Sequence, residues 1–412
     1  MKKYHLITLI LLINGIYNSL AVSQTSTQKP LENVFTLELS FGDKDIPDEF
    51  LLAQPRQFKV NDAGDIYVFD EYKVKVFDKN GKPKAIFGGR GQGPGEFEGT
   101  VSRLFISPEG WLTVSERNSW SVLSPANKFI SKNLYYSNAV LNTLKNDYKI
   151  STSAGGKGQD IFVLNDKEFI FVGSTATFDN YNEAGEYYDY IFYAHENKVS
   201  VITKYRDVGA FMYKSGIIVT SVLGSLSFEI LPGSKIIYTH PYHDVKYTND
   251  TAQLTFRIVS LVDNTKNEFI ISYKPEVIAD STIKSFDPSY IEKLNNEIAL
   301  KNNWPPSKMS NEQKELYNKV GNALKKMKYD LPFTDMQSDG VYLFLRCHSS
   351  DNKMSLIRVI NAETGKEVSN FTQPSNFYLD SIKNGYGYLS TTPKDGYPIV
   401  EKYRIDPRVY GR

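Results

Sequence analysis

Two histidines and a carboxylate stand close together in the turn 239–244, whose sequence is Thr-His-Pro-Tyr-His-Asp. Imidazole nitrogens and carboxylate oxygens are common ligands of zinc and similar ions. A His-x-x-His spacing within a loop is weak evidence for a metal, however, and local packing or contact with a ligand explains it better. We therefore expect no metal at this turn and treat Tyr242 and His243 as candidate ligand contacts.

A glycine-rich loop covers residues 88–95, Gly-Gly-Arg-Gly-Gln-Gly-Pro-Gly. Such a run could cradle a phosphate, but no helix follows it and no Lys-Ser or Lys-Thr pair closes it. A tight turn that requires positive φ angles explains the glycines better. Arg90 at the tip of the loop is our candidate contact for an anionic group.

The sequence contains no recognisable nucleophilic centre. There is no Gly-x-Ser-x-Gly elbow and no His-Glu-x-x-His motif. Cys347 is the only cysteine, and it falls on the same side of the strand 341–347 as three apolar residues. Burial among apolar groups disfavours the thiolate, so we expect an inert thiol, no disulfide and no catalytic residue.

The elements that would position these residues are strands. Segments 66–70 and 73–77 alternate in hydrophobicity, and the turn Asp70-Glu71-Tyr72 joins them. One such sheet cannot bury both of its faces alone, which implies neighbouring copies stacked around an axis. Six clusters of strands occur along the chain, at 56–87, 101–132, 160–205, 225–261, 333–371 and 377–405.

The sixth cluster looks one strand short, whereas the alternating segment 34–39 has no cluster of its own. Pairing the two ends in one sheet closes the ring and hides strand edges that would otherwise promote aggregation. We therefore predict an all-β fold, a six-bladed β-propeller closed by an N-terminal strand and formed as a single domain by residues 24–412.

One segment departs from the β pattern, between clusters four and five. Asp287-Pro288 suits the start of a helix, and apolar residues then recur at helical spacing. The break Trp304-Pro305-Pro306 is followed by the segment 310–313, Ser-Asn-Glu-Gln, which has the capping-box spacing of a second helix. We predict a helical hairpin over about 285–329 whose apolar stripes pack on the propeller. A docking face for a partner helix is the alternative.

The first residues have the layout of a secretory leader. Lys2-Lys3 precede the apolar run 6–13, and small residues follow at Ser19 and Ala21. The apolar run is too short to span a bilayer. We predict a signal peptide over residues 1–23, no membrane span, and a protein that is secreted or periplasmic.

Charge is almost balanced, with 48 Lys and Arg residues against 47 Asp and Glu residues. Removal of Lys2 and Lys3 with the leader changes the formal net charge from +1 to −1. No field of one sign is available to attract nucleic acid or an anionic membrane, so we expect neither as a partner.

The first cluster resembles the NHL repeat in the segments 62–68, 74–78 and 91–97, which read Asp-Ala-Gly-Asp-Ile-Tyr-Val, Val-Lys-Val-Phe-Asp and Gly-Gln-Gly-Pro-Gly-Glu-Phe. The chain as a whole is similar to secreted bacterial six-bladed NHL-like propellers that carry a helical insertion. The family's Asn-x-Arg before the third strand is absent, and Glu71-Tyr72-Lys73 stands there, so a contact made by that arginine is not expected. The resemblance implies a propeller that binds something, without implying a reaction.

Topology then predicts a functional surface. In a four-stranded up-and-down blade, the loops between strands two and three emerge on the same face as the links between successive blades. By this rule one face carries the glycine-rich loop, the segment 174–187, the turn 240–244, the turn 349–351 and the helical insertion. Our candidate ligand contacts on this face are Arg90, Arg117, Tyr242, His243 and Trp304.

The function predicted from these features is a monomeric, non-enzymatic binding propeller that takes up a protein, peptide or glycan ligand without a cofactor. The alternative is a metal-dependent hydrolase or lyase, in which carboxylates from different blades hold a divalent cation such as calcium or zinc on the axis. A structural member of a cell-envelope assembly is a third interpretation.

Overall fold

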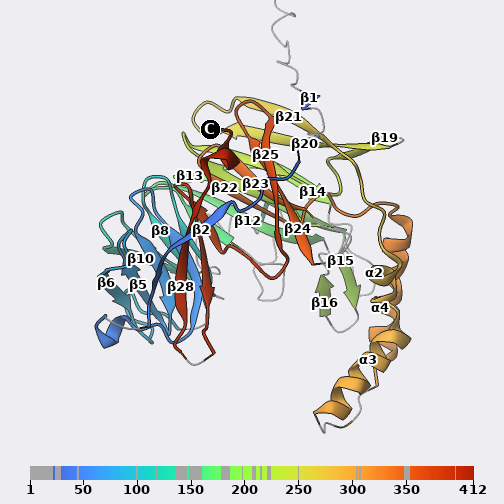
Figure 1. Ribbon diagram of the computed structural model, residues 1–412, viewed down its shortest axis with the longest axis horizontal. Helices are drawn as coiled ribbons and strands as arrows, with labels where there is room; N and C mark the ends of the chain where they lie inside the picture. Colours follow the sequence, from blue (N-terminus) through green and yellow to red (C-terminus); the bar gives the residue numbers. More distant parts are fainter. Residues whose placement is uncertain are drawn as a thin grey trace, which may run out of the picture.

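The computed structural model contains six sheets arranged as the blades of a propeller (Figure 1). The structure describes residues 22–23, 29–43, 46–98, 101–116, 118–134, 146–147, 160–177, 186–196, 198–206, 210–213, 216–219, 224–248, 250–302, 305, 308–347, 353–394 and 396–412.

Each blade has four antiparallel strands, which follow one another outward from the axis in the order named. Blade 1 is β3 (Pro55–Val60), β4 (Ile66–Asp70), β5 (Lys73–Phe77) and β6 (Pro83–Gly88). Blade 2 is β7 (Val101–Ile106), β8 (Leu112–Glu116), β9 (Ser119–Leu123) and β10 (Phe129–Leu134). Blade 3 is β11 (Asp160–Val163), β12 (Glu168–Thr177), β13 (Glu186–His195) and β14 (Lys198–Arg206). Blade 4 is β17 (Ser227–Leu231), β18 (Lys235–Thr239), β20 (Thr251–Ser260) and β21 (Lys266–Tyr273). Blade 5 is β22 (Asp335–Asp339), β23 (Tyr342–Cys347), β24 (Met354–Asn361) and β25 (Lys366–Pro374). Blade 6 is β26 (Ser381–Lys383), β27 (Tyr386–Thr391), β28 (Ile399–Ile405) and β2 (Phe35–Phe41).

The first strand of each blade lies nearest the axis of the ring. Strand β7 contacts β3 and β11, strand β22 contacts β17 and β26, and strand β26 contacts β3. The innermost strands therefore succeed one another around the axis, and this arrangement brings residues that are far apart in the sequence close together.

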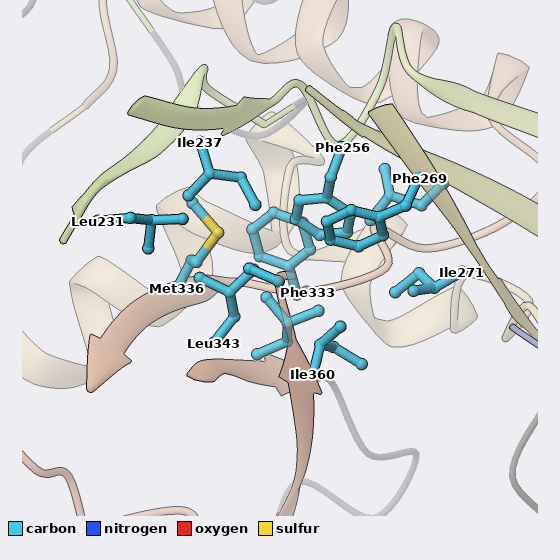
Figure 2. Packing of buried hydrophobic residues seen from close by; sticks show 12 residues of the cluster. Leu231, Ile237, Phe256, Phe269, Ile271, Phe333, Met336, Leu343 and Ile360 are labelled. Atoms are coloured by element: carbon cyan, nitrogen blue, oxygen red, sulfur yellow. The ribbon is translucent and has the colours of Figure 1, made fainter. Parts of the chain in front are cut away.

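A separate apolar core fills each interface between neighbouring blades. Figure 2 shows the core between blades 4 and 5, where Phe256 and Phe269 face Met336 and Leu343. The rings of Phe256 and Phe269 are stacked with their centroids 5.1 Å apart. Because every blade buries apolar side chains on both sides, the ring as a whole is the unit that buries a core.

The ring is closed by the two ends of the chain, as the sequence predicts. Strand β2 pairs with β28 in antiparallel register from Phe35 opposite Ile405 to Phe41 opposite Val400. The N-terminal strand thus supplies the outermost strand of blade 6, which removes the open edge that β28 would otherwise present. A second short pairing joins β1 (Val22–Ser23), at the end of the predicted leader, to β21 in parallel.

The end of the fourth strand cluster, predicted at residue 261, is too early. Blade 4 continues through β21 to Tyr273, because the turn after Ser260 leads into one more paired strand. Two short elements were also missed: the hairpin of β15 (Ala210–Tyr213) with β16 (Gly216–Val219), and β19 (Val245–Thr248), which pairs with the first half of β20.

The helical insertion lies between β21 and β22, as predicted, and it begins with a short helix that the sequence did not reveal. The helices are α2 (Asp280–Lys284), α3 (Pro288–Lys301) and α4 (Asn311–Lys326). Asp287 caps α3 by accepting from the backbone N–H groups of Ser289 and Tyr290, and Ser310 forms the predicted capping box with Gln313.

The prediction that both helical stripes pack on the propeller is not confirmed, because the α3 stripe is exposed and the α4 stripe packs on other residues of the insertion. In α4, Val320 and Leu324 are buried with Ile278 in a small apolar core. In α3, Leu294 and Ile298 are each 43% exposed. The reason is visible in Figure 1, where α3 points away from the blades and only α4 and α2 lie beside them.

The expectation of one elaborated face is confirmed where the structure describes it. Because the strands alternate in direction, the glycine-rich loop, the turn 240–244 and the helical insertion all emerge on the face that carries the links between blades. We call this the crossover face. The predicted segments 178–185 and 348–352 lie outside the described residues, and residues 174–177 belong to strand β12.

Candidate functional site

A group of charged side chains gathers around the axis of the ring. Each innermost strand, or the residue just before it, contributes one member. The members are Lys59, Arg103, Asp160, Glu229, Asp335 and Asp380, from blades 1 to 6 in that order. We call this set the axial cluster.

Alternation along the innermost strands explains why charged residues reach this place. In β3, Phe58 and Val60 are buried in the core between blades 6 and 1, whereas Lys59 between them keeps part of its surface accessible. In β17, Glu229 likewise remains partly accessible two residues before the buried Leu231. Neighbouring strand residues point to opposite sides, so Lys59 is directed away from the core that holds Phe58 and Val60. Glu229 is likewise directed away from the core between blades 3 and 4, against which its neighbours Phe228 and Ile230 pack.

Lys59 is the centre of this cluster electrostatically. Burial lowers the pKa of its ammonium group, and Arg103 lowers it further, while Glu229, Asp335 and Asp380 oppose this shift. The Lys59 ammonium nevertheless forms no hydrogen bond or ion pair with the part of the chain that the structure describes. Lys59 is therefore held among charges of both signs, and no described residue accepts a hydrogen bond from it.

Glu229 is perturbed in the complementary direction. Burial raises the pKa of its carboxyl to about 7, and Asp335 raises it further, while Lys59, Arg103 and a hydrogen bond from the Ser338 hydroxyl at 2.8 Å oppose the shift. Near neutral pH this carboxyl exchanges between its protonated and ionised forms. It can therefore either donate or accept a hydrogen bond at the axis.

The remaining charges define the end of the cluster that lies toward the crossover face. Asp160 and Asp335 are the first residues of their strands, and Asp380 immediately precedes β26. The Arg103 guanidinium lies 3.0 Å from an Asp160 oxygen and over the ring of Phe162. Burial raises the pKa of the Asp380 carboxyl, against a backbone hydrogen bond from Ser390 and the charge of Lys59.

The five predicted contact residues are placed outside this cluster or lie outside the described residues. Arg117 and Trp304 lie outside the described residues. Arg90 is exposed, and its guanidinium carbon lies 5.4 Å from the centroid of the Tyr72 ring. No hydrogen bond, ion pair or ring contact within the described residues joins Arg90, Tyr242 or His243 to the axial cluster.

The turn 240–244 is held together by its own histidines. The Nδ1 atom of His240 accepts from the backbone N–H groups of Tyr242 at 3.2 Å and His243 at 3.4 Å. The Nε2 atom of His243 donates to the carbonyl oxygen of Arg206 at 2.5 Å, and its ring contacts that of Tyr242 edge-on. The structure thus brings Tyr242 and His243 together, with these ring nitrogens engaged in local packing.

Metal ligands do not converge in the part of the chain that the structure describes. There, no group of three or more His, Cys, Asp and Glu side chains is arranged to hold a metal ion. On the axis, Lys59 and Arg103 stand among the four carboxylates, and their positive charges oppose the binding of a divalent cation.

The glycine-rich loop and Cys347 match the structural roles expected of them. Gly88 and Gly95 have φ angles of 95° and 79°, and a Cβ atom at Gly88 would lie 2.4 Å from the Phe97 ring. Cys347 packs against the core between blades 4 and 5, and burial raises the pKa of its thiol to about 11. Neither is suited to phosphate binding or nucleophilic attack.

The axial cluster was missed because the sequence does not show which strands meet at the axis. A signal was present, however. Lys59 stands between Phe58 and Val60, and Glu229 stands between Phe228 and Ile230, each in the first strand of its cluster. A lone charge between large apolar residues in the first strand of each blade would have singled out these two positions.

Comparison with known proteins supports the fold. Residues 20–106 match the family model DUF5128, which is described as a 6-bladed beta-propeller. The match includes the closing strand β2, blade 1 and the first strand of blade 2. No curated protein matches the chain. In the described residues no helix is long and apolar enough to cross a membrane.

Two similar solved structures come from Bacteroides species. One is a protein of Bacteroides fragilis described as an exported protein, with 12% sequence identity, a TM-score of 0.47, and coverage of 94% of this chain and 100% of that one. The other is a member of the duf4221 family from Bacteroides vulgatus, with 11% identity, a TM-score of 0.44, and coverage of 90% and 98%.

Proposed function

We propose that this chain is a non-enzymatic binding propeller that works outside the cytoplasm and receives a protein, peptide or glycan ligand on the crossover face, over the axial cluster. The proposal retains the NHL-like, ligand-binding interpretation of the sequence. It moves the centre of the binding site from the outer loops to the axis.

One observation carries the proposal: six charged residues from six blades converge at the axis, and in the described residues only Arg103 and Asp160 among them form an ion pair. Charged groups that leave water lose hydration free energy, and structural ion pairs recover it through short contacts and hydrogen bonds. Lys59 recovers no hydration free energy through a hydrogen bond or ion pair with the described residues, and its side chain remains partly accessible to a ligand. A ligand that accepts from Lys59 would supply the missing interaction.

The surroundings of the cluster favour the crossover face as the side of entry. Asp160, Asp335 and Asp380 lie at the ends of the innermost strands that face this side. The glycine-rich loop, the turn 240–244 and the helical insertion emerge there as well, and loops on a rigid scaffold are the usual carriers of recognition. The predicted leader over residues 1–23 supports a secreted or periplasmic location.

Binding assays with defined probes test the proposal. The purified protein would be screened against immobilised glycans and against a display library of random peptides. The best probe would then be titrated with wild type, Lys59→Met, Glu229→Gln and the control Lys84→Met. Lys84 carries the same charge but lies on β6, the outermost strand of blade 1, where it pairs with Asp65. Its side chain is 46% exposed.

We expect Lys59→Met and Glu229→Gln to weaken binding by about tenfold or more, because each removes a desolvated charged contact. Lys84→Met should bind as wild type does. Equal affinity in all four proteins, or a complete absence of binding to both classes of probe, would contradict the proposal.

A further inference from the structure

The exposed tyrosines that the structure describes are gathered on one face. Five tyrosines in the described residues have exposed fractions between 39% and 58%: Tyr242, Tyr247, Tyr290, Tyr378 and Tyr397. All five lie in links between blades, in loops between second and third strands, or in the helical insertion. They therefore belong to the crossover face, where the proposed function places a ligand.

Tyr378 differs from the others because its hydroxyl is bonded to a member of the axial cluster. Its hydroxyl donates to Asp335 at 3.1 Å, and the Arg346 guanidinium lies 5.0 Å from the centroid of its ring. Arg346 is itself fixed, since it donates to the carbonyl oxygens of Ser375 at 2.6 Å and Phe377 at 3.3 Å. The Tyr378 ring nevertheless stays 45% exposed.

A fixed and exposed aromatic ring is suited to stacking. Exposing a large apolar surface gains nothing for folding, and fixing the side chain costs conformational entropy. A ligand that stacks on the ring meets a surface already ordered, so it loses less free energy on binding than one that must order a mobile side chain. These properties point to a ligand that covers the free part of the Tyr378 ring.

Two carboxylates act on the hydroxyl of this ring. Asp335 accepts from Tyr378 and, at 3.1 Å, from Gln337, and the Asp380 carboxylate accepts from the backbone of Ser390 at 3.0 Å. The pKa of the Tyr378 hydroxyl is raised to about 12, first by burial and then by the charges of Asp335 and Asp380. Each carboxylate has more acceptor sites than these bonds use.

We propose that Tyr378 is a stacking platform for a neutral sugar ring, with Asp335 and Asp380 accepting hydrogen bonds from its hydroxyl groups. This inference rests on the proposed function and narrows its ligand to a neutral glycan. A sugar presents an apolar C–H face to an aromatic ring and many O–H donors at its edge, which matches the platform and its carboxylates.

Two other ligand classes fit this place less well. A cationic peptide side chain would stack on a ring whose other side already meets the Arg346 guanidinium, so two positive charges would act on one ring. An anionic sugar would meet the carboxylates of Asp335 and Asp380. A neutral ring avoids both repulsions.

The cavity beside Tyr378 does not itself accommodate a sugar. A cavity lined by Asp335, Gln337, Arg346 and Tyr378 among others has a volume of about 30 Å³. That volume accommodates a water molecule and is far too small for a sugar. The ligand would therefore lie on the exposed surface of Tyr378.

The test is a titration with a neutral oligosaccharide chosen from an array that also carries acidic sugars, amino sugars and peptides. The proteins compared are wild type, Tyr378→Ala, Tyr378→Phe, Asp380→Asn and the control Tyr290→Ala. Tyr290 is matched in exposure, at 50%, and lies on α3 away from the axis. Thermal unfolding of each variant verifies that it is folded.

We expect wild type to prefer a neutral oligosaccharide, and Tyr378→Ala to lose about tenfold or more in affinity. Tyr378→Phe should retain most of the affinity, because it keeps the ring, and Asp380→Asn should lose several-fold. Tyr290→Ala should match wild type.

Three results would overturn the sugar platform. One is binding of a neutral glycan that Tyr378→Ala does not weaken. Another is a preference for acidic sugars, and the third is a preference for peptides. If a preferred peptide or acidic sugar still requires Lys59 and Glu229, the inference about the ligand fails while the proposed binding function stands.

Discussion

Two lysines of this protein, Lys75 and Lys59, lie near carboxylates in the interior of the ring, and they differ in how fully their ammonium groups are bonded. In blade 1 the Lys75 ammonium lies 2.7 Å from an Asp70 oxygen and also donates to the Leu51 carbonyl. Asp70 accepts in addition from the backbone N–H groups of Ala53 and Gln54. The Lys75 and Asp70 side chains are 5% and 0% exposed.

At the axis, Lys59 and Glu229 influence each other's pKa, but no hydrogen bond or ion pair joins them in the described residues. Both remain partly accessible. The comparison teaches that residue type alone does not separate structure from function: Asp70 and Lys75 tie the link 51–54 to its blade, whereas Lys59 and Glu229 keep bonding capacity for something else.

The largest effect that would sharpen this comparison is expected from Asp70→Ala. Removing the carboxylate leaves the buried Lys75 ammonium without its counter-charge and two backbone N–H groups without an acceptor. We expect the free energy of unfolding to fall by about 3–5 kcal/mol, measured by urea denaturation. Glu32→Ala is the control, because its pair with Lys29 is 71–85% exposed, and it should change stability by less than about 0.5 kcal/mol.

The second effect concerns the pH dependence of Glu229. Its pKa is raised from 4.5 to about 7 in the folded protein, so the folded state holds this proton more tightly than the unfolded state does. The stabilisation that Glu229 contributes by holding this proton is fully present below about pH 4.5 and is lost as the pH rises through about 7. The expected loss is about 3 kcal/mol.

Glu229→Gln should lack this loss. Denaturation of wild type and variant at a series of pH values between about 4 and 8 measures the difference, about 3 kcal/mol over the whole range. A difference in stability that does not change over this range would show that Glu229 is not desolvated at the axis, and the contrast with Asp70 would then disappear.

The sequence allowed the ring to be predicted because the relevant signals are local. Alternation shows each strand, and the unpaired segment 34–39 matched the deficit in the last cluster, which β2 now fills. The capping box at Ser310 likewise marked α4 correctly. Such features depend on residues a few positions apart.

The axial cluster could not be predicted in this way, because it depends on closure of the whole ring. Lys59 and Glu229 are far apart in sequence, and they meet only because β3 and β17 both lie innermost. The prediction for α3 was wrong for a different reason: its regular apolar spacing predicted a stripe packed on the propeller. Leu294 and Ile298 stay exposed because α3 extends beyond the blades.

A third prediction concerns Lys59→Met. Because burial disfavours the charged ammonium and no bond with the described residues compensates for it, removal of the charge should leave the free energy of unfolding within about 1 kcal/mol of wild type at pH 7. Thermal unfolding checks this. Lys75→Met in the same assay provides the contrast, since it should destabilise as strongly as Asp70→Ala.

The smallest effects are expected in the exposed loops of the crossover face. Arg90→Ala, Tyr242→Ala and His243→Ala should each change the free energy of unfolding by no more than about 0.5 kcal/mol. A larger loss in His243→Ala would show that its hydrogen bond to the Arg206 carbonyl is structural, which would remove His243 from the candidate ligand contacts.

The most direct test of the account is the stability of the double variant Lys59→Met/Glu229→Gln at pH 7, measured by urea denaturation in parallel with Asp70→Ala. We predict that the free energy of unfolding of the double variant falls no more than about 1 kcal/mol below that of wild type, because the axial charges do not hold the ring together. A loss of about 3–5 kcal/mol, equal to that of Asp70→Ala, would show that the axial cluster is a structural ion network and would contradict its assignment as a binding site.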